Sequence, residues 1–137
     1  MIGLNSDVLE LLHEGTVIPA HPLALDENRV LDEAHQRLLT RYYLASGVGG
    51  IAVGVHTTQF EIREPRYNLF EKVLQLAVDE VRKASLTRPF IKVAGICGGT
   101  NQAVEQAKMA KRLGYYIGLL IVNGMGDWSA VNLQQDY

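Results

Sequence analysis

The side chains of this sequence that can do chemistry stand just after apolar segments. His21 and His56 each follow such a segment, which is the placement expected of acid–base groups or metal ligands that meet at one end of a sheet. A metal site needs a third ligand, for which Asp127 is only a weak candidate, so structural hydrogen bonding is favoured and no metal is expected. Cys97 has the placement of a nucleophile, but free cysteine is among the most buried residue types, which favours a structural role.

Two further motifs leave alternatives open. The turn Gly95-Ile96-Cys97-Gly98-Gly99-Thr100 precedes a helical pattern and has the composition of a phosphate cradle at a helix N-terminus. It matches neither the dinucleotide-binding fingerprint nor the phosphate-loop pattern. Thr57 and Thr58 either end a strand and start a turn or place two hydroxyl groups at a functional end of the fold.

Four strand-like segments must position these residues, and helical patterns separate them. The segments are Thr16–Ala20, Gly50–Val55, Phe90–Ile96 and Gly118–Val122. This alternation predicts an α/β fold with a parallel sheet built from βαβ units. An eight-stranded (β/α)₈ TIM barrel needs about 250 residues, so 137 residues are predicted to hold about four βα units, a half-barrel. We expect a single domain, 1–137, with a helical prefix at 1–15, the βα units at 16–127 and the start of an unfinished helix at 128–137.

Apolar spacing and capping residues place the helices between these strands. Ser6 or Asp7 is predicted to cap a helix through His13, and Asp32 a helix to about Ser46. Thr100 is predicted to cap a later helix that Gly114 ends. The inward faces are predicted to be Ala34, Leu38, Tyr42 and Ala45 in the helix after Asp32, and Leu69, Val73, Leu76, Ala77, Val81 and Ala84 in the next one.

The composition excludes several classes of protein. The net charge is −2 and no Lys/Arg cluster is interleaved with aromatic residues, so nucleic acid is not an expected partner. The single cysteine forbids an intrachain disulfide and fits a reducing compartment. No segment approaches the ~20 apolar residues of a membrane span, and the N-terminus has no secretory pattern. We therefore expect a cytoplasmic protein without membrane contacts.

Three strand ends together resemble a known family. They read His21-Pro22-Leu23, then Val55-His56-Thr57-Thr58-Gln59, then Ala94-Gly95-Ile96-Cys97-Gly98-Gly99-Thr100. Between Val17 and Val122 the sequence resembles the dihydrodipicolinate synthase and N-acetylneuraminate lyase family of class I aldolase-type TIM barrels. There the first strand ends in Thr-Pro-Phe, the second in Gly-Thr-Thr-Gly-Glu or Gly-Ser-Thr-Gly-Glu, and the third in a Gly-x-Gly stretch before a threonine-capped helix. No motif is intact, and the resemblance depends on their order and spacing.

This resemblance implies a lyase mechanism. A lysine on the sixth strand forms a Schiff base with a 2-keto acid such as pyruvate, and the imine acts as an electron sink. Hydroxyl and amide donors at the second strand hold the carboxylate. By resemblance, Thr57 and Thr58 are carboxylate contacts, Thr57 is also a proton-relay residue, and His56 and His21 belong to the substrate site. An ungapped alignment puts the hydroxyl pair at His56 and Thr57, whereas one gap puts it at Thr57 and Thr58. No cofactor is implied.

The sequence also departs from the family. The positions of the Schiff-base lysine and the fifth-strand tyrosine fall beyond residue 137, and Lys92 is not at an equivalent position. Asn123-Gly124-Met125-Gly126 replaces the Thr-Pro-Tyr-Tyr segment that carries a relay tyrosine. We therefore expect chemistry only in a complete barrel. The alternatives are a non-catalytic module that binds phosphate or another small molecule, and a self-associating α/β module. Unpaired strand edges favour a homo-oligomer.

Overall fold

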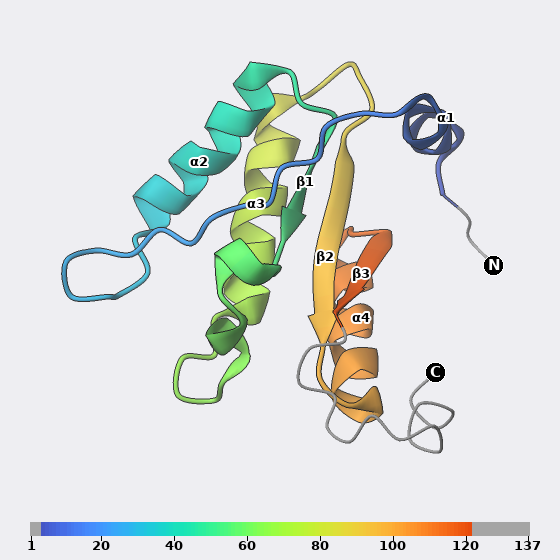
Figure 1. Cartoon of the computed structure of the whole chain (residues 1–137). Coiled ribbons are helices and arrows are strands. Elements are labelled where there is room, and N and C mark those ends of the chain that lie inside the picture. Colours follow the sequence, from blue (N-terminus) through green and yellow to red (C-terminus); the bar gives the residue numbers. More distant parts are fainter. Residues whose placement is uncertain (1–3, 122–137) are drawn as a thin grey trace.

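A three-stranded parallel sheet forms the centre of the protein (Figure 1). The computed structural model describes residues 4–121. The strands are β1 (Gly50–Val53), β2 (Ile91–Cys97) and β3 (Ile117–Ile121), in the order β1-β2-β3. A helical crossover joins β1 to β2 and another joins β2 to β3, so β1–β2 and β2–β3 are two successive βαβ units.

Three long helices lie on one side of this sheet: the second and third pack on its face, and the first packs against the second. They are α2 (Glu33–Ser46), α3 (Phe70–Ala84) and α4 (Thr100–Leu113). The main core lies between them and the sheet. The apolar run of β1 is buried along its whole length, because both faces of the strand are covered. The fully buried members of this core include Ile51, Val53, Val73, Leu74 and Ala94.

The short helix α1 (Ser6–Glu14) covers the other face. Its side chains Val8, Leu11 and Leu12 pack against a second cluster on the sheet. That cluster consists of Ala52, Val55, Ile91 and Val93. Alternate residues of β1 and β2 therefore point to the two covered faces, as the two-residue period of a strand requires.

The first predicted strand is only partly formed. Residues 16–20 run parallel to β1, and Gly49 N donates to the Val17 carbonyl while Ala52 N donates to that of Pro19. Only Ala20 forms a ladder bridge, with Ala52. Pro19 has no N–H to donate, so a regular ladder cannot continue through it. The segment occupies the place of the predicted strand without being one.

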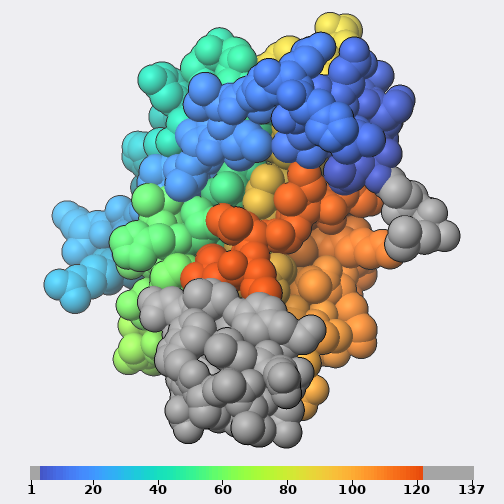
Figure 2. Space-filling view, turned by 45° about the vertical axis from the view of Figure 1, so that its right-hand side comes forward, coloured from blue at the N-terminus to red at the C-terminus, as the bar shows by residue number. Residues whose placement is uncertain are grey.

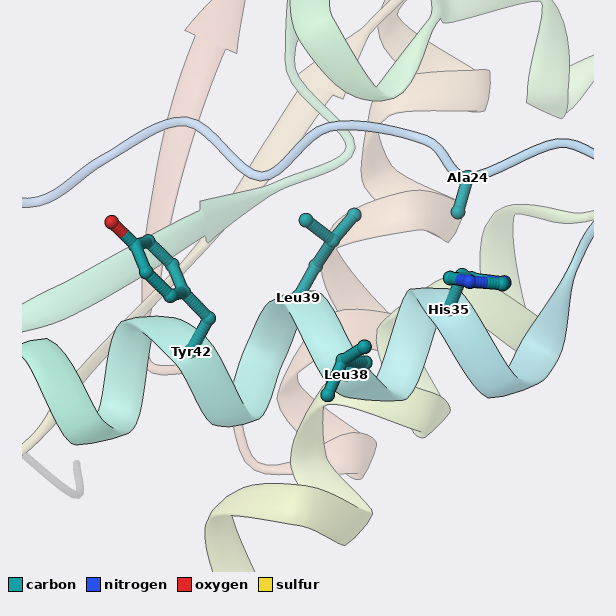
Figure 3. Close-up of a pocket in the computed structure, with 5 residues that line it drawn as sticks. All are labelled: Ala24, His35, Leu38, Leu39 and Tyr42. Atoms are coloured by element: carbon teal, nitrogen blue, oxygen red, sulfur yellow. The ribbon is translucent and has the colours of Figure 1, made fainter.

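The inward face predicted for α2 is wrong. Leu38 and Tyr42 are 53% and 66% exposed, and Figure 3 shows them with His35 and Leu39 beside a shallow hollow of about 420 Å³. Ala34 and Ala45 are exposed too, and the buried residues are Gln36, Thr40 and Leu44. Hydrogen bonds of Gln36 explain why this other face is buried. The Gln36 side chain accepts from Ala24 N at 2.7 Å and donates to the Pro22 carbonyl at 3.1 Å. Buried backbone groups need such partners.

The helix ends agree with most of the capping predictions. Asp32 caps α2 through His35 N, and the helix ends at Ser46, as predicted. Helix α1 is capped by Asn5 rather than Ser6 or Asp7, because the Asn5 side chain accepts from the Asp7 amide, and it ends one residue after His13. The N-cap of α4 is Gly99, so the predicted cap Thr100 is instead its first residue.

The other predictions concern the buried face of α3, the limits of the strands and the residues after 121. Val73, Leu76 and Ala77 are buried in α3 as predicted, whereas Ala84 is exposed. The strands begin or end within two residues of their predicted limits. The predicted loop 123–127 and the unfinished helix 128–137 lie outside the described residues. Within residues 4–121, no helix is both long and apolar enough to cross a membrane.

Candidate functional site

The carboxyl end of β1 leads into two short 3₁₀ turns, η1 (His56–Thr58) and η2 (Phe60–Arg63). Gly54 makes the exit from the strand with φ +78°, and a Cβ there would lie 2.8 Å from the Phe70 ring. Glycine is therefore required both by the left-handed backbone and by the close approach of α3. This turn places η1 at the carboxyl edge of the sheet, where parallel sheets generally bind ligands.

Thr58 is a structural residue in this arrangement. Its side chain is completely buried. The Thr58 hydroxyl donates to the His21 carbonyl at 2.6 Å and accepts from Gly54 N at 3.0 Å. Both hydrogen-bonding directions are thus used within the protein, and the hydroxyl is not exposed to a substrate.

Thr57 differs from its neighbour in exposure. Its side chain is exposed, and its hydroxyl donates to the same His21 carbonyl at 3.2 Å. Because Thr58 already satisfies that carbonyl with a shorter bond, the Thr57 hydroxyl can turn to another acceptor without leaving the carbonyl unpaired. Of the two predicted carboxylate contacts, only Thr57 is an exposed residue.

His21 and His56 do not share one open site. His21 is completely buried, with Nδ1 donating to the Pro22 carbonyl at 2.7 Å and Nε2 accepting from the Thr40 hydroxyl at 2.8 Å. Burial lowers the pKa of His21, so its ring is neutral near pH 7. The ring of His56 is exposed and makes an edge contact with Phe60 at 5.8 Å between centroids. His21 therefore positions the threonines through its backbone carbonyl, and His56 is the exposed imidazole.

The structure does not add a third ligand, among the described residues, to the metal site considered for His21 and His56. No group of three His, Cys, Asp or Glu side chains within residues 4–121 is arranged to hold a metal ion. Asp127, the third ligand considered from the sequence, lies outside the described residues. The buried ring of His21 already uses both nitrogens in hydrogen bonds within the protein.

Arg63 was not singled out from the sequence, yet it joins the ends of two strands. Its Nη2 donates to the carbonyls of Gly54 at 2.6 Å and Gly95 at 2.8 Å, and the guanidinium stacks on Phe70 at 4.3 Å from the ring centroid. Burial lowers the pKa of Arg63, and its Nη1 is buried without a hydrogen-bond partner among residues 4–121. In the sequence Arg63 stands in a charged stretch, 61–66, that is typical of a solvated loop. The only signal for its buried position is the glycines of the preceding strand, which allow another group to approach the backbone closely.

Gln106 of α4 extends this clamp to the end of β2. Its Oε1 accepts from Arg63 Nε at 3.0 Å and from Cys97 N at 3.0 Å, and its Nε2 donates to the Cys97 carbonyl at 3.0 Å. The amide side chain thus pairs with Cys97 as a neighbouring strand would. Cys97 is partly buried, and its structural role stays a prediction, with the nucleophile as the alternative; the phosphate cradle at Gly98 and Gly99 is likewise an alternative that no contact tests.

Comparisons with known proteins identify the fold. No protein-family model and no curated protein sequence matches this chain. Among solved structures, N-acetylneuraminate lyase from Mycoplasma synoviae superimposes with a TM-score of 0.69 and 19% identity over 83% of this chain and 38% of that chain. Dihydrodipicolinate synthase from Bacillus anthracis superimposes with a TM-score of 0.71 and 22% identity, over 89% of this chain and 40% of that chain. A catalytic lysine mutant of Ruminococcus gnavus sialic acid aldolase superimposes with a TM-score of 0.66 and 20% identity, over 89% of this chain and 38% of that chain.

This chain spans about two fifths of the length of those proteins. The similarity includes most of the described residues and agrees with the two successive parallel βαβ units of the sheet. It confirms the fold that the sequence resemblance implied. The chain therefore has the α/β fold of part of a TIM barrel, the barrel of N-acetylneuraminate lyase and dihydrodipicolinate synthase structures.

Proposed function

We propose that this chain is the carboxylate-binding part of a barrel of the dihydrodipicolinate synthase and N-acetylneuraminate lyase family, which acts on a 2-keto acid such as pyruvate. The observation that carries the proposal is that Thr57, an exposed residue with a hydroxyl group, lies at the carboxyl edge of a sheet with this fold. A hydroxyl held at a strand end is a preorganised donor for a carboxylate. Thr57 also occupies the hydroxyl position in both alignments with the family motif.

The neighbouring residues have distinct roles in this proposal. Thr57 turns its hydroxyl from the His21 carbonyl to the substrate carboxylate, and in the complete barrel it can relay a proton. Thr58 keeps the carbonyl satisfied and so holds η1 in place during this exchange. His56 lies beside Thr57 on η1 and supplies an exposed imidazole. The predicted substrate contacts are thereby reduced to Thr57 and His56, with Thr58 and His21 supporting them.

The carbon–carbon bond chemistry is proposed for the complete barrel only. Imine formation needs a lysine near the bound keto acid. The lysine on the described part of the sheet, Lys92, is the second residue of β2, whereas the carboxyl edge lies at Cys97. Cys97 comes five positions after Lys92 in the strand, a distance of about 17 Å. We therefore expect the isolated chain to bind the keto acid without cleaving or forming a carbon–carbon bond.

An NMR titration of the ¹⁵N-labelled chain with pyruvate tests the binding step. We expect the amide signals of η1 to shift with pyruvate but not with acetone, which has the keto group and lacks the carboxylate. Thr57→Val removes the hydroxyl with little change in shape and is expected to abolish the shifts. Shifts that persist in Thr57→Val, or that are absent from η1 in the unmodified chain, contradict the proposed carboxylate site.

We also propose that the chain self-associates through β3. Within the described residues β3 is an edge of the sheet, and Figure 2 shows it (orange to red) at the surface. Leu119 and Leu120 are 50% and 45% exposed there, whereas the corresponding middle of β2 is buried. An unpaired edge that carries apolar side chains favours pairing with another strand.

A further inference from the structure

Lys92 lies in surroundings unlike those of other lysines of this chain. It is the second residue of β2, its side chain is half-buried, and within the described residues no acidic group is at ion-pair distance from it. Three other lysines have an acidic partner: Lys72 with Glu33 at 2.8 Å, Lys83 with Glu80 at 3.7 Å and Lys108 with Glu105 at 3.2 Å. A positive charge that is half-buried and unpaired is costly to keep.

The side chain of Lys92 lines a cavity of about 350 Å³ at the amino end of the sheet. The first turn of α1, the loop before β2 and Tyr116 form the rest of its wall. Arg88 also lines the cavity, with its guanidinium bonded to backbone carbonyls of α2 and the following loop, and Arg82 of α3 repels the Lys92 charge. Asp7 is the one acidic residue among the cavity's lining. The local charge is therefore positive overall.

These surroundings favour the neutral, nucleophilic form of the Lys92 amine more than those of an exposed lysine do. Burial, and to a smaller extent Arg82, lower the pKa of Lys92, so a larger share of its amine is neutral at a given pH than in an exposed lysine. Opposing this are Asp7 and the carboxyl end of α4, since a Cβ on Gly114 would lie 3.6 Å from Lys92 Nζ. The neutral amine carries the lone pair that attacks a carbonyl carbon.

We propose that Lys92 is an acylation site, at which small acyl phosphates transfer their acyl group to Nζ. The lone pair of the amine attacks the acyl carbon, the N–C bond forms, the bond from that carbon to the phosphate oxygen breaks, inorganic phosphate leaves and one amine proton passes to water. The surrounding arginines attract the phosphate group of the donor. The product is a neutral amide, which removes an unpaired half-buried charge, so the fold itself favours the modified state.

Acetylation of the intact chain by acetyl phosphate tests this proposal. Peptide mass spectrometry gives the rate at each lysine, and Lys111, exposed near the end of α4, serves as the internal comparison. We expect Lys92 to react severalfold faster than Lys111 in the folded chain and at the same rate in concentrated urea, where the surroundings are lost. An equal or slower rate at Lys92 in the folded chain, or a preference that survives in urea, overturns the proposal.

Two substitutions check the charge argument separately. Lys92→Gln resembles the neutral product and is expected to leave the urea midpoint at pH 7 unchanged or higher, whereas Lys92→Arg keeps the charge and is expected to lower it. A lower midpoint for Lys92→Gln than for Lys92→Arg contradicts the proposal. Because this cavity lies at the opposite end of β2 from Thr57, these results are independent of pyruvate binding.

Discussion

Thr57 and Thr58 are adjacent residues with the same side chain and different surroundings. Both donate to the His21 carbonyl, but only Thr58 is buried and also accepts from the backbone, at Gly54 N. A buried donor left without its partner costs more free energy than the bond itself contributes. The stability of η1 is therefore concentrated in Thr58, while Thr57 is the residue to which we assign the proposed ligand contact.

The same substitution at both positions separates these roles. We expect Thr58→Val to lower the free energy of unfolding by about 1–3 kcal/mol, because the Gly54 amide loses its partner. Thr57→Val is expected to change it by less than about 0.5 kcal/mol, as is usual at exposed positions. Urea unfolding followed by circular dichroism measures both. Equal losses for the two variants would show that the division of roles is wrong.

His21 is expected to make stability depend on pH. Burial lowers the pKa of His21 in the folded chain below 6.5, its ordinary value, which the unfolded chain keeps. Below about pH 6.5 the unfolded chain therefore binds a proton that the folded chain resists, and the free energy of unfolding falls by up to about 1.4 kcal/mol per pH unit. Above that pH the contribution is fully present.

Urea titrations at a series of pH values measure this dependence. His21→Asn is expected to be less stable at pH 7 but to lose less stability on acidification than the unmodified chain. His13→Asn, at an exposed position of α1, is the control and is expected to keep the slope of the unmodified chain. If His21→Asn keeps that slope too, another group causes the acid sensitivity.

At the scale of elements, the approach of β1 to β2 depends on Gly95. A Cβ at this position would lie 2.3 Å from the Gly54 carbonyl oxygen, which is backbone and cannot move aside cheaply. We expect Gly95→Ala to lower the free energy of unfolding by about 3 kcal/mol. Gly99→Ala is the control, because no described atom lies within 4 Å of a Cβ there, and the poorer N-cap that alanine gives α4 is expected to cost only about 1 kcal/mol. Thermal unfolding compares the two, and a similar midpoint for both variants would contradict the close approach.

Arg63 is expected to hold the ends of β1 and β2 at their spacing. Arg63→Met removes the donors to the Gly54 and Gly95 carbonyls, and we expect a loss of about 3 kcal/mol in the free energy of unfolding. Arg66→Met is the control, because Arg66 is exposed and its guanidinium pairs with the side chain of Glu64, two residues before it. Urea unfolding measures the difference. Equal midpoints for the two variants would show that the hydrogen bonds of Arg63 do not stabilise the fold.

Local patterns in the sequence predicted most elements but not the faces of all of them. Asp32 as a cap and the glycines after α2 and α4 act on neighbouring backbone, so sequence alone identified these helix limits. The inward side of α2 depends on Gln36, which satisfies backbone groups of a segment more than ten residues away. Apolar spacing carries no signal for such a contact. The Thr57 hydroxyl position was predictable from its motif, whereas the Arg63 clamp needed the fold.

At the scale of the molecule, the exposed edge at β3 is expected to cause self-association. Leu120→Lys places a charge on that edge, and we expect it to shift the chain from oligomer to monomer in sedimentation velocity experiments. Val104→Lys on α4 is the control, since Val104 is 44% exposed and Leu120 is 45% exposed. A monodisperse monomer of the unmodified chain would count against the proposed homo-oligomer.

The contacts of Arg63 also have a consequence for the order in which the protein opens. The Arg63 side chain, in the loop after β1, is bonded to β2 and α4 and to Gly54, the first residue after β1, so that loop cannot detach while those elements remain assembled. Loops usually exchange their amide protons through small local fluctuations. Here the amides of Thr58 and Ile62 are expected to exchange together with those of the strands, so that the proposed substrate loop unfolds as part of the same cooperative unit as the core.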